Sequence, residues 1–282
     1  MKPAPRTGSW RPFVAAGVLS VLGFAPGAHA QKSQKLEAPR AALRAKAPEG
    51  PKQERVPQEE PTVESDARTA APKQKDVPPE LTNVAASVGF FLETWTTPRD
   101  TFWVLRERPD GHHGAGAYVV RTGEATDDVV QVPHPYFDIG TEDIGAGLFS
   151  CPPEGRAPRL FMTATAHRYH GTPGETPEDP EHPADVAHNP DHLFQTVTDL
   201  AARNLHAPRV VQLHGFGESK VQKGRTETLT AVVSDGSRTP GAWARSVSAP
   251  LDEALGHGVK LFPEGVQVLG GTQNAQARLL QA

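Results

Sequence analysis

Short apolar runs recur along the C-terminal part of the chain and are separated by polar stretches. Two of them, 102–106 and 117–121, flank a Pro-Asp-Gly-His-His-Gly segment and predict a β-hairpin. Five further runs have the length and the β-branched or large apolar content of strands that are buried on both faces. These five predicted strands are 128–132, 159–164, 209–213, 230–233 and 266–269.

Three segments between or after these strands have the spacing of amphipathic helices. Segment 191–204 places its apolar residues one helical turn apart, and 241–255 and 273–280 show the same pattern. Strands that alternate with helices imply an α/β fold with a mostly parallel or mixed sheet and helices on both faces. Residues 81–282, roughly 200 residues, are enough for one such domain.

The pattern of apolar runs is absent from residues 31–80. This segment holds eight of the 28 prolines and nineteen charged side chains, and it has no aromatic residue. Such a segment cannot bury enough apolar surface to offset the entropy of ordering it. We therefore expect 31–80 to be a disordered, extended linker rich in proline and charge.

Residues 1–30 have the pattern of a secretory signal. A basic start precedes the apolar run 13–24, and Ala28-His29-Ala30 fits a small-residue cleavage site. The run is shorter than the roughly 20 residues that a helix needs to span a bilayer. We predict cleavage after Ala30, export to the periplasm or the extracellular space, and no stable membrane span after cleavage. An uncleaved N-terminal anchor is the alternative.

Cysteine content and charge narrow the function classes. The only cysteine is Cys151, so the chain has no internal disulfide and must be held by its core, or by a core and a metal. The formal net charge is −4, and no basic patch is interleaved with aromatic residues. A nucleic-acid partner is therefore not expected.

Polar or glycine-rich residues follow each of the five predicted inner strands. Open α/β sheets bind ligands beyond the carboxyl ends of their strands, so we expect a site along this edge. The five segments are 133–138, 167–170, 214–218, 234–238 and 270–274.

Histidine is concentrated near these strand ends, with eight of the twelve histidines between residues 134 and 214. His134 and His214 follow apolar strands, and neutral imidazole is a preferred zinc ligand. A catalytic zinc site commonly has three protein ligands and an open fourth position, so a carboxylate would complete it. Asp138 and Glu142 both follow His134 closely, and either can supply that oxygen. Loop histidines also satisfy hydrogen bonds without a metal.

The elements Pro133-His134, the acids downstream, and Gln212-Leu213-His214-Gly215 resemble the zinc carboxypeptidase and N-formylglutamate amidohydrolase superfamily, which includes poly-γ-glutamate hydrolases. The resemblance covers about 130–282. In the carboxypeptidases a glutamate stands three positions after the first histidine, where this chain has Phe137. The first carboxylate ligand is therefore reassigned to Asp138 or Glu142.

The resemblance implies an exported zinc-dependent hydrolase that cleaves an amide or peptide bond in a small molecule or peptide bearing carboxylates. A zinc-bound water attacks the scissile carbonyl in such enzymes, and a carboxylate serves as general base. The late glutamate of the carboxypeptidases has no equivalent here, so Glu218, four residues after His214, is the candidate base. Arg168 is the candidate for binding a carboxylate or the oxyanion.

Four further residues are expected to contact the substrate because of their places at strand ends or in the loop before a helix: His167, His188, Arg238 and Asn274. His192 is expected on the surface of the predicted helix, with Asp191 as its N-cap. The stretch 171–183 has four prolines and four acids and is interpreted as a flexible loop over the site, or as an insertion.

Two alternatives remain. The missing late glutamate also fits a secreted binding protein on the same fold that has lost its general base. A serine hydrolase using Ser234 with Asp235 and a histidine is disfavoured, because the Ser234-Asp-Gly turn lacks the Gly-x-Ser-x-Gly elbow that exposes a nucleophile.

Overall fold

The computed structural model describes residues 17–23, 76–111, 113–153, 155–170, 183–216 and 229–281. Most of the predicted signal and linker, most of the 171–183 loop, and Glu218 therefore lie outside the described residues. No helix in the described ranges is long and apolar enough to cross a membrane.

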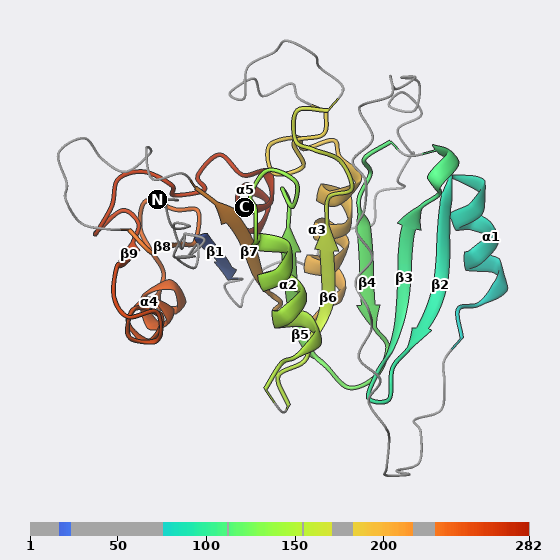
Figure 1. Ribbon diagram of the computed structural model, residues 1–282, viewed down its shortest axis with the longest axis horizontal. Coiled ribbons are helices and arrows are strands. Elements are labelled where there is room, and N and C mark those ends of the chain that lie inside the picture. The colour runs from blue at the N-terminus through green and yellow to red at the C-terminus, as the bar shows by residue number, and fades with distance from the viewer. Residues whose placement is uncertain are drawn as a thin grey trace, which may run out of the picture.

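The described residues form one mixed sheet of nine strands in the order β2-β3-β4-β6-β5-β7-β1-β8-β9 (Figure 1). Strands β5, β6 and β7 are parallel neighbours at its centre. Strands β2, β3, β4 and β6 pair antiparallel. The strands are β1 (Gly17–Gly23), β2 (Phe90–Thr96), β3 (Thr101–Glu107), β4 (Ala117–Arg121), β5 (Thr126–Val132), β6 (Pro158–Thr163), β7 (Arg209–Gly215), β8 (Ala231–Ser234) and β9 (Val259–Leu261).

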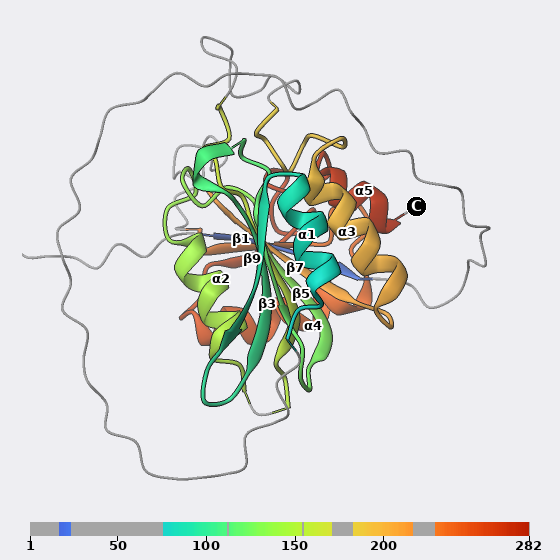
Figure 2. The same cartoon turned by 90° about the vertical axis from the view of Figure 1, so that its right-hand side faces the viewer.

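Helices cover both faces of the sheet, which confirms the predicted α/β class. Seen edge-on, α2 lies on one face, and α1, α3 and α5 lie on the other (Figure 2). The helices are α1 (Pro79–Ser87), α2 (Thr141–Ser150), α3 (Leu193–Asn204), α4 (Ala242–Ala254) and α5 (Ala275–Gln281). The three predicted helices correspond to α3, α4 and α5. Helices α1 and α2 and strands β1, β2 and β9 were not predicted.

The two faces of the central strands bury two separate cores because successive side chains of a strand point to opposite faces. On the α3 and α5 face, Val129 and Val210 pack with Phe194 and Leu280. On the α2 face, the main members are Val130, Val132, Phe149, Phe161 and Leu213. Burial on both faces explains why adjacent positions are apolar in both strands, Val129 and Val130 in β5 and Val210 and Val211 in β7, as predicted for inner strands.

The predicted hairpin is present: β3 and β4 pair antiparallel around the Pro109–Gly111 turn. The end of the hairpin opposite this turn is fixed by Arg121, the last residue of β4. Its side chain is 1% exposed and forms an ion pair with Asp100. The Arg121 guanidinium also donates to the carbonyl oxygens of Phe149 and Pro158. Such a buried cation needs this set of partners because desolvation without them is costly.

The prediction that 266–269 is a strand is wrong. None of these residues is in a strand; Gln267 and Val268 form a bend, and the last strand of the sheet is instead β9, which pairs with β8. Val266 is buried against Val232 and Phe262, so the apolar run reflects packing rather than ladder hydrogen bonds. The expectation that all five segments share one sheet edge is also corrected: β1 is antiparallel to β7 and parallel to β8, so β7 and β8 run in opposite directions.

Strand β1 comes from the apolar run that was interpreted as the core of a signal. It lies between β7 and β8, with Val18 opposite His214 and Leu19 opposite Val233. Cleavage after Ala30 would therefore remove one strand from the sheet beside a candidate metal ligand.

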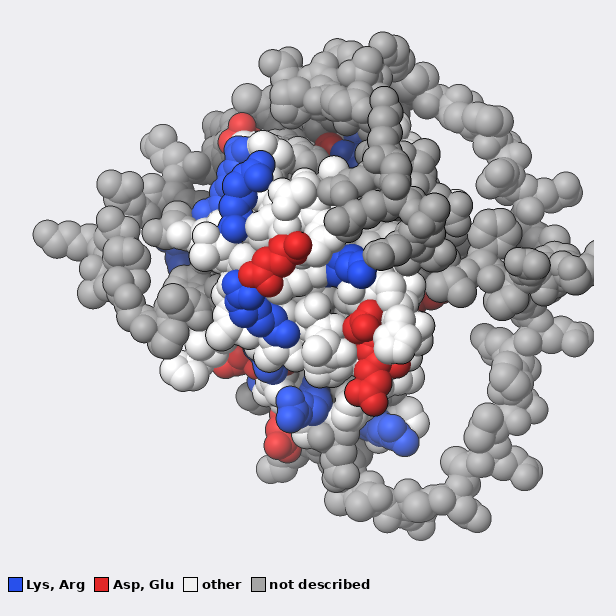
Figure 3. Space-filling view, turned by 90° about the vertical axis from the view of Figure 1, so that its left-hand side faces the viewer, with Lys and Arg blue, Asp and Glu red and all other residues white. Residues whose placement is uncertain are grey.

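The end of the sheet formed by β8, β9 and α4 is viewed in Figure 3. Basic and acidic side chains are interspersed on the described part of this face, in line with the totals of 29 basic and 33 acidic residues. One ion pair joins Arg245 of α4 to Glu264 after β9, at 2.5 Å.

Candidate metal centre

The first part of the site is a tight turn directly after β5. The amide of Asp138 donates to the carbonyl of His134 at 2.8 Å, and the amide of Phe137 donates to the same oxygen at 3.1 Å. Thr141, at the start of α2, donates through its hydroxyl to the carbonyl of Asp138 at 2.7 Å. This single helical turn brings the Asp138 carboxylate back beside the His134 ring.

The second part is His214, near the end of β7. The next residue, Gly215, lets the two parts meet: a Cβ atom there would lie 3.1 Å from both the Cα and the Cβ of Asp138. Any larger residue at 215 would therefore press on the Asp138 turn. Because β5 and β7 are parallel neighbours, their carboxyl ends bring His134 and His214 to the same edge, as predicted.

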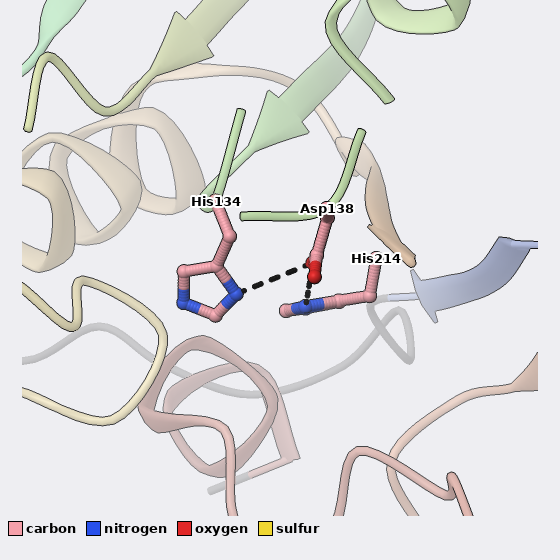
Figure 4. Close-up of side chains that lie close together, drawn as sticks. All are labelled: His134, Asp138 and His214. Atoms are coloured by element: carbon pink, nitrogen blue, oxygen red, sulfur yellow. Dashed lines mark ion pairs between the residues drawn. The ribbon is translucent and has the colours of Figure 1, made fainter. Parts of the chain in front are cut away.

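Three side chains converge at this edge (Figure 4). The Nδ1 atom of His134 lies 3.4 Å from Oδ2 of Asp138, and Nδ1 of His214 lies 3.5 Å from the same oxygen. The ring centroids of the two histidines are 5.1 Å apart. One donor atom from each of the three residues lies within 4.8 Å of the others, so this group can hold a metal ion.

Two of the converging atoms lack ordinary hydrogen bonds. Within the described part of the chain, Nδ1 of His134 and Oδ2 of Asp138 are buried and have no hydrogen-bond partner. His134 is 1% exposed and Asp138 is 5% exposed. Buried polar atoms are nearly always satisfied, and a pair of them that face each other at 3.4 Å fits an ion between them.

The electrostatics of the group favour the metal-binding protonation states. Burial alone would raise the pKa of Asp138, but the hydrogen bonds and positive charge that His134 and His214 supply when their rings are protonated hold that pKa well below its usual range. Burial lowers the pKa of His214 below its ordinary value, and only in part does Asp138 oppose this. An ionised carboxylate and a neutral imidazole are the forms that ligate a divalent cation.

His134 is held from its other side by Asp185, which sequence reasoning missed. Oδ1 of Asp185 lies 2.9 Å from Nε2 of His134, while Oδ2 contacts Arg168 and lies 3.0 Å from Nδ1 of His188. Burial would raise the pKa of Asp185, but the hydrogen bonds from His134 and His188 hold it well below its usual range. The anionic Asp185 therefore favours the Nε2–H tautomer of His134, which leaves Nδ1 free to face Asp138.

His214 is held from its other side by neutral side chains. Its Nε2 atom lies 2.8 Å from Oε1 of Gln212, which is fully buried. Asn274 donates to the same Gln212 oxygen, and its Nδ2 also lies 3.3 Å from Nε2 of His214. The predicted substrate contact Asn274 is thus buried against the far side of the His214 ring.

Of the two acids that the sequence left open, the structure places Asp138 with the histidines. Glu142 lies on the first turn of α2 and is exposed. The predicted site residue Arg238 is an exposed residue in the segment after β8, which runs opposite to β7. Glu218, the predicted general base, lies outside the described residues, so that prediction is not tested.

Arg168 and His167 form an aromatic cluster beside the site. The guanidinium of Arg168 lies 5.4 Å from the ring centroids of both Phe137 and Tyr169. The His167 ring packs against the same two rings, at 5.7 Å and 5.3 Å. Because Arg168 already binds Asp185, a role as substrate clamp remains a prediction.

Two other expectations are settled by hydrogen bonds. His192 is the N-cap of α3: its Nδ1 accepts from the amide of Phe194 at 3.0 Å, so the residue is not on the helix surface as predicted. The Ser234 hydroxyl is fully buried and donates to the carbonyl of Gly270 at 2.6 Å. A buried hydroxyl in this structural bond does not serve as an exposed nucleophile.

No family model matches this chain, and no curated protein or solved structure matches it either.

Proposed function

We propose that this chain is a zinc-dependent amidohydrolase or peptidase that acts on a substrate bearing carboxylates. The observation on which this depends is the buried pair formed by His134 Nδ1 and Asp138 Oδ2, without hydrogen-bond partners, beside Nδ1 of His214. Two histidines and one carboxylate match the three-ligand pattern of catalytic zinc sites that keep an open position. We include in this proposal that the domain has the zinc carboxypeptidase fold.

His134, Asp138 and His214 would hold the ion. When bound, zinc lowers the pKa of a coordinated water towards about 7 and polarises a carbonyl oxygen. The residues themselves supply position and exclude solvent, because the donor atoms are fixed by buried contacts before any ligand arrives.

His188 is our candidate for proton transfer. Its Nδ1 lies 3.0 Å from the anionic Asp185, so the proton of the neutral ring is held at Nδ1 and Nε2 is left as an acceptor. The side chain is 31% exposed, in contrast to the ligand His134 at 1%, and so stays accessible to solvent and substrate. A histidine oriented by a carboxylate is a common general base.

The metal proposal is tested by metal analysis of the purified full chain after exposure to zinc and removal of excess. We expect stoichiometric zinc in the wild type and its loss in His134→Ala and His214→Ala. The exposed loop residue His206 gives the matched control, His206→Ala, which should keep its zinc. Zinc content that is the same in all four proteins contradicts the site.

Turnover separates the enzyme from a secreted binding protein on the same fold. The substrates to test are formyl-amino acids, γ-glutamyl polymers and cell-wall peptides, each with the zinc-loaded chain and with His134→Ala. Zinc-dependent release of an amine supports the hydrolase. Zinc binding with no release from any substrate favours the binding protein.

Export with cleavage after Ala30 is part of the same proposal. Intact-mass analysis of protein recovered from the secreting cell should give a chain that begins at Gln31. A chain that retains Met1 and requires detergent for extraction would favour the uncleaved anchor. Zinc content of the processed and the unprocessed chain then shows whether β1, which pairs with β7 at His214, affects the site.

A further inference from the structure

Three glutamines with no solvent exposure lie together on the α3 and α5 face of the sheet: Gln131 of β5, Gln212 of β7 and Gln276 of α5. Gln131 and Gln212 are register partners in adjacent parallel strands. An apolar core with three buried amides is stable only if each amide is hydrogen-bonded. Neither the proposed zinc ligands nor the proposed proton transfer uses these side chains directly.

Two fixed backbone carbonyls set the direction of every bond in this group. Gln276 Nε2 donates to the carbonyl of Val186 at 2.8 Å, so its Oε1 must face Gln212. Gln212 Nε2 donates to that oxygen at 3.1 Å and to Oε1 of Gln131 at 2.9 Å.

The other end of the group is fixed in the same way. Gln131 Nε2 donates to the Thr198 hydroxyl at 2.9 Å, and this hydroxyl donates to the carbonyl of Phe194 at 2.8 Å. A backbone carbonyl can only accept, so reversing any one amide would set two acceptors or two donors against each other. Both ends therefore require that Gln212 turn its oxygen towards His214.

We propose that Gln212, oriented by Gln276 and the Val186 carbonyl, is a positioning residue that holds His214 in the Nε2–H tautomer and so presents its Nδ1 lone pair to the metal position. The 2.8 Å contact between Nε2 of His214 and the Gln212 oxygen requires a proton on Nε2, since otherwise two lone pairs would face each other. In that tautomer Nδ1, which lies 3.5 Å from the Asp138 carboxylate, is unprotonated.

The competing arrangement has Asn274 donating to an unprotonated Nε2 of His214. Their separation is 3.3 Å, longer than the 2.8 Å contact to Gln212. The same Asn274 nitrogen already donates to the Gln212 oxygen. The shorter contact decides the tautomer, and Asn274 is left to keep the Gln212 oxygen in place.

This inference deepens the proposed zinc site and rests on it for its functional meaning, but the tautomer itself is measurable without metal. The test is long-range nitrogen–proton correlation NMR on the metal-free, nitrogen-15-labelled full chain at pH 7.5. The His214 signals are assigned by their loss in His214→Asn. We expect the Nε2–H tautomer, and a proton on Nδ1 would overturn the proposal whatever the variants do.

Two variants and a control then test the cause. Gln276→Leu breaks the relay without touching His214, and Gln212→Leu removes the acceptor. We expect a mixture of tautomers in both, and zinc binding weaker by about 10- to 100-fold, the usual effect of losing a group that orients a ligand. The control Gln195→Leu removes an amide that donates to Ala275 outside the relay and should leave the tautomer unchanged.

The outcomes separate this inference from the proposed function. An Nε2–H tautomer that is lost in both relay variants supports the relay even if the wild type binds no zinc, which would contradict only the zinc proposal. An unchanged tautomer in folded Gln212→Leu and Gln276→Leu overturns the relay even if zinc binds. Circular dichroism spectra of the variants establish that they are folded.

Discussion

The two histidines of the metal group are held in different ways. His134 has its outer nitrogen, Nε2, against the buried carboxylate of Asp185 at 2.9 Å. His214 has the corresponding nitrogen against the neutral amide oxygen of Gln212 at 2.8 Å. Both arrangements leave Nδ1 facing Asp138. The same orientation of two ligands is thus reached once by a charge and once by a network of amides.

The two supports differ in the charge that they bring to the site. Asp185 is also bound by Arg168 and His188, so its negative charge is compensated before a metal arrives. The Gln212 network contains no ionisable side chain and adds no charge. A carboxylate partner makes an imidazole a more basic ligand, whereas an amide mainly fixes its direction. We therefore expect His134 to be the more strongly electron-donating of the two ligands.

A third histidine, His192, shows what a purely structural imidazole looks like in this fold. Its Nδ1 accepts from Phe194 and its Nε2 lies 3.1 Å from the carbonyl of Gly114. Both ring nitrogens are therefore used. In His134 only one nitrogen is used, and the other is buried without a partner. That free nitrogen, rather than burial, distinguishes a candidate ligand from a core histidine.

The largest expected effect comes from Asp138, because the Nδ1 atoms of His134 and His214 both face its carboxylate. Asp138→Asn keeps the shape but removes the charge, so we expect the loss of stoichiometric zinc, measured by metal analysis. Glu142→Gln, at the exposed acid that the sequence left open, is the matched control and should retain zinc. Retention in Asp138→Asn with loss in Glu142→Gln would reverse the assignment of the carboxylate ligand.

Asp185 contacts His188 as well as His134, whereas Gln212 contacts no second histidine in the described residues. A substitution of His188 therefore tests whether Asp185 also orients a proton-transfer group. His188→Asn should lower kcat by about 10²- to 10⁴-fold, the usual contribution of general acid–base catalysis, while zinc content is unchanged. The assay is zinc-dependent amide cleavage together with metal analysis. His167→Asn, beside Phe137 and Tyr169, is the control, a nearby histidine to which the described residues supply no carboxylate partner. Equal losses in the two variants contradict the role of His188.

Removing the charged support should cost more zinc affinity than removing the neutral one. We expect Asp185→Asn to weaken zinc binding by about 10- to 100-fold, and by more than Gln212→Leu, as competition with a chelator would measure. It should also lower the free energy of unfolding, because Arg168 loses a buried anion. Equal affinities in the two variants would mean that the charge of Asp185 does not strengthen His134 as a ligand.

Sequence patterns predicted the central strands and the closeness of His134, Asp138 and His214 because both depend on local features. Apolar runs gave β5, β6 and β7, and their parallel order placed His134 and His214 at one edge. The direction of β8 was not predictable, since a run of buried residues has the same pattern in either direction. The prediction of a strand at 266–269 was wrong because apolar content indicates burial and does not indicate strand pairing.

The supports of the ligands were harder to predict than the ligands. Asp185 is 51 residues from His134, and nothing local marks a lone acid as its partner. A signal for the amide network does exist: Val-Val-Gln occurs in two apolar runs, at 129–131 and at 210–212. A glutamine at the same place in two buried strands indicates a polar contact between them, which the register of β5 and β7 contains.

The smallest expected effect concerns His192 and the pH dependence of stability. Burial lowers the pKa of His192 below its ordinary 6.5, although Gly114 and Glu107 oppose the shift. The unfolded chain therefore binds a proton more readily than the folded one, and stability falls as pH falls below about 6.5. His192→Asn keeps an N-cap acceptor for Phe194 but does not titrate.

We expect the urea midpoint of His192→Asn to drop less between pH 7.5 and pH 5.5 than that of the wild type. His206→Asn, at an exposed loop histidine, serves as the control and should keep the wild-type dependence. Metal-free protein is used for all three, so that release of a metal from the proposed site does not add to the slope. Parallel slopes in wild type and His192→Asn would show that protonation of His192 costs nothing, which is incompatible with an imidazole whose two nitrogens both form structural hydrogen bonds.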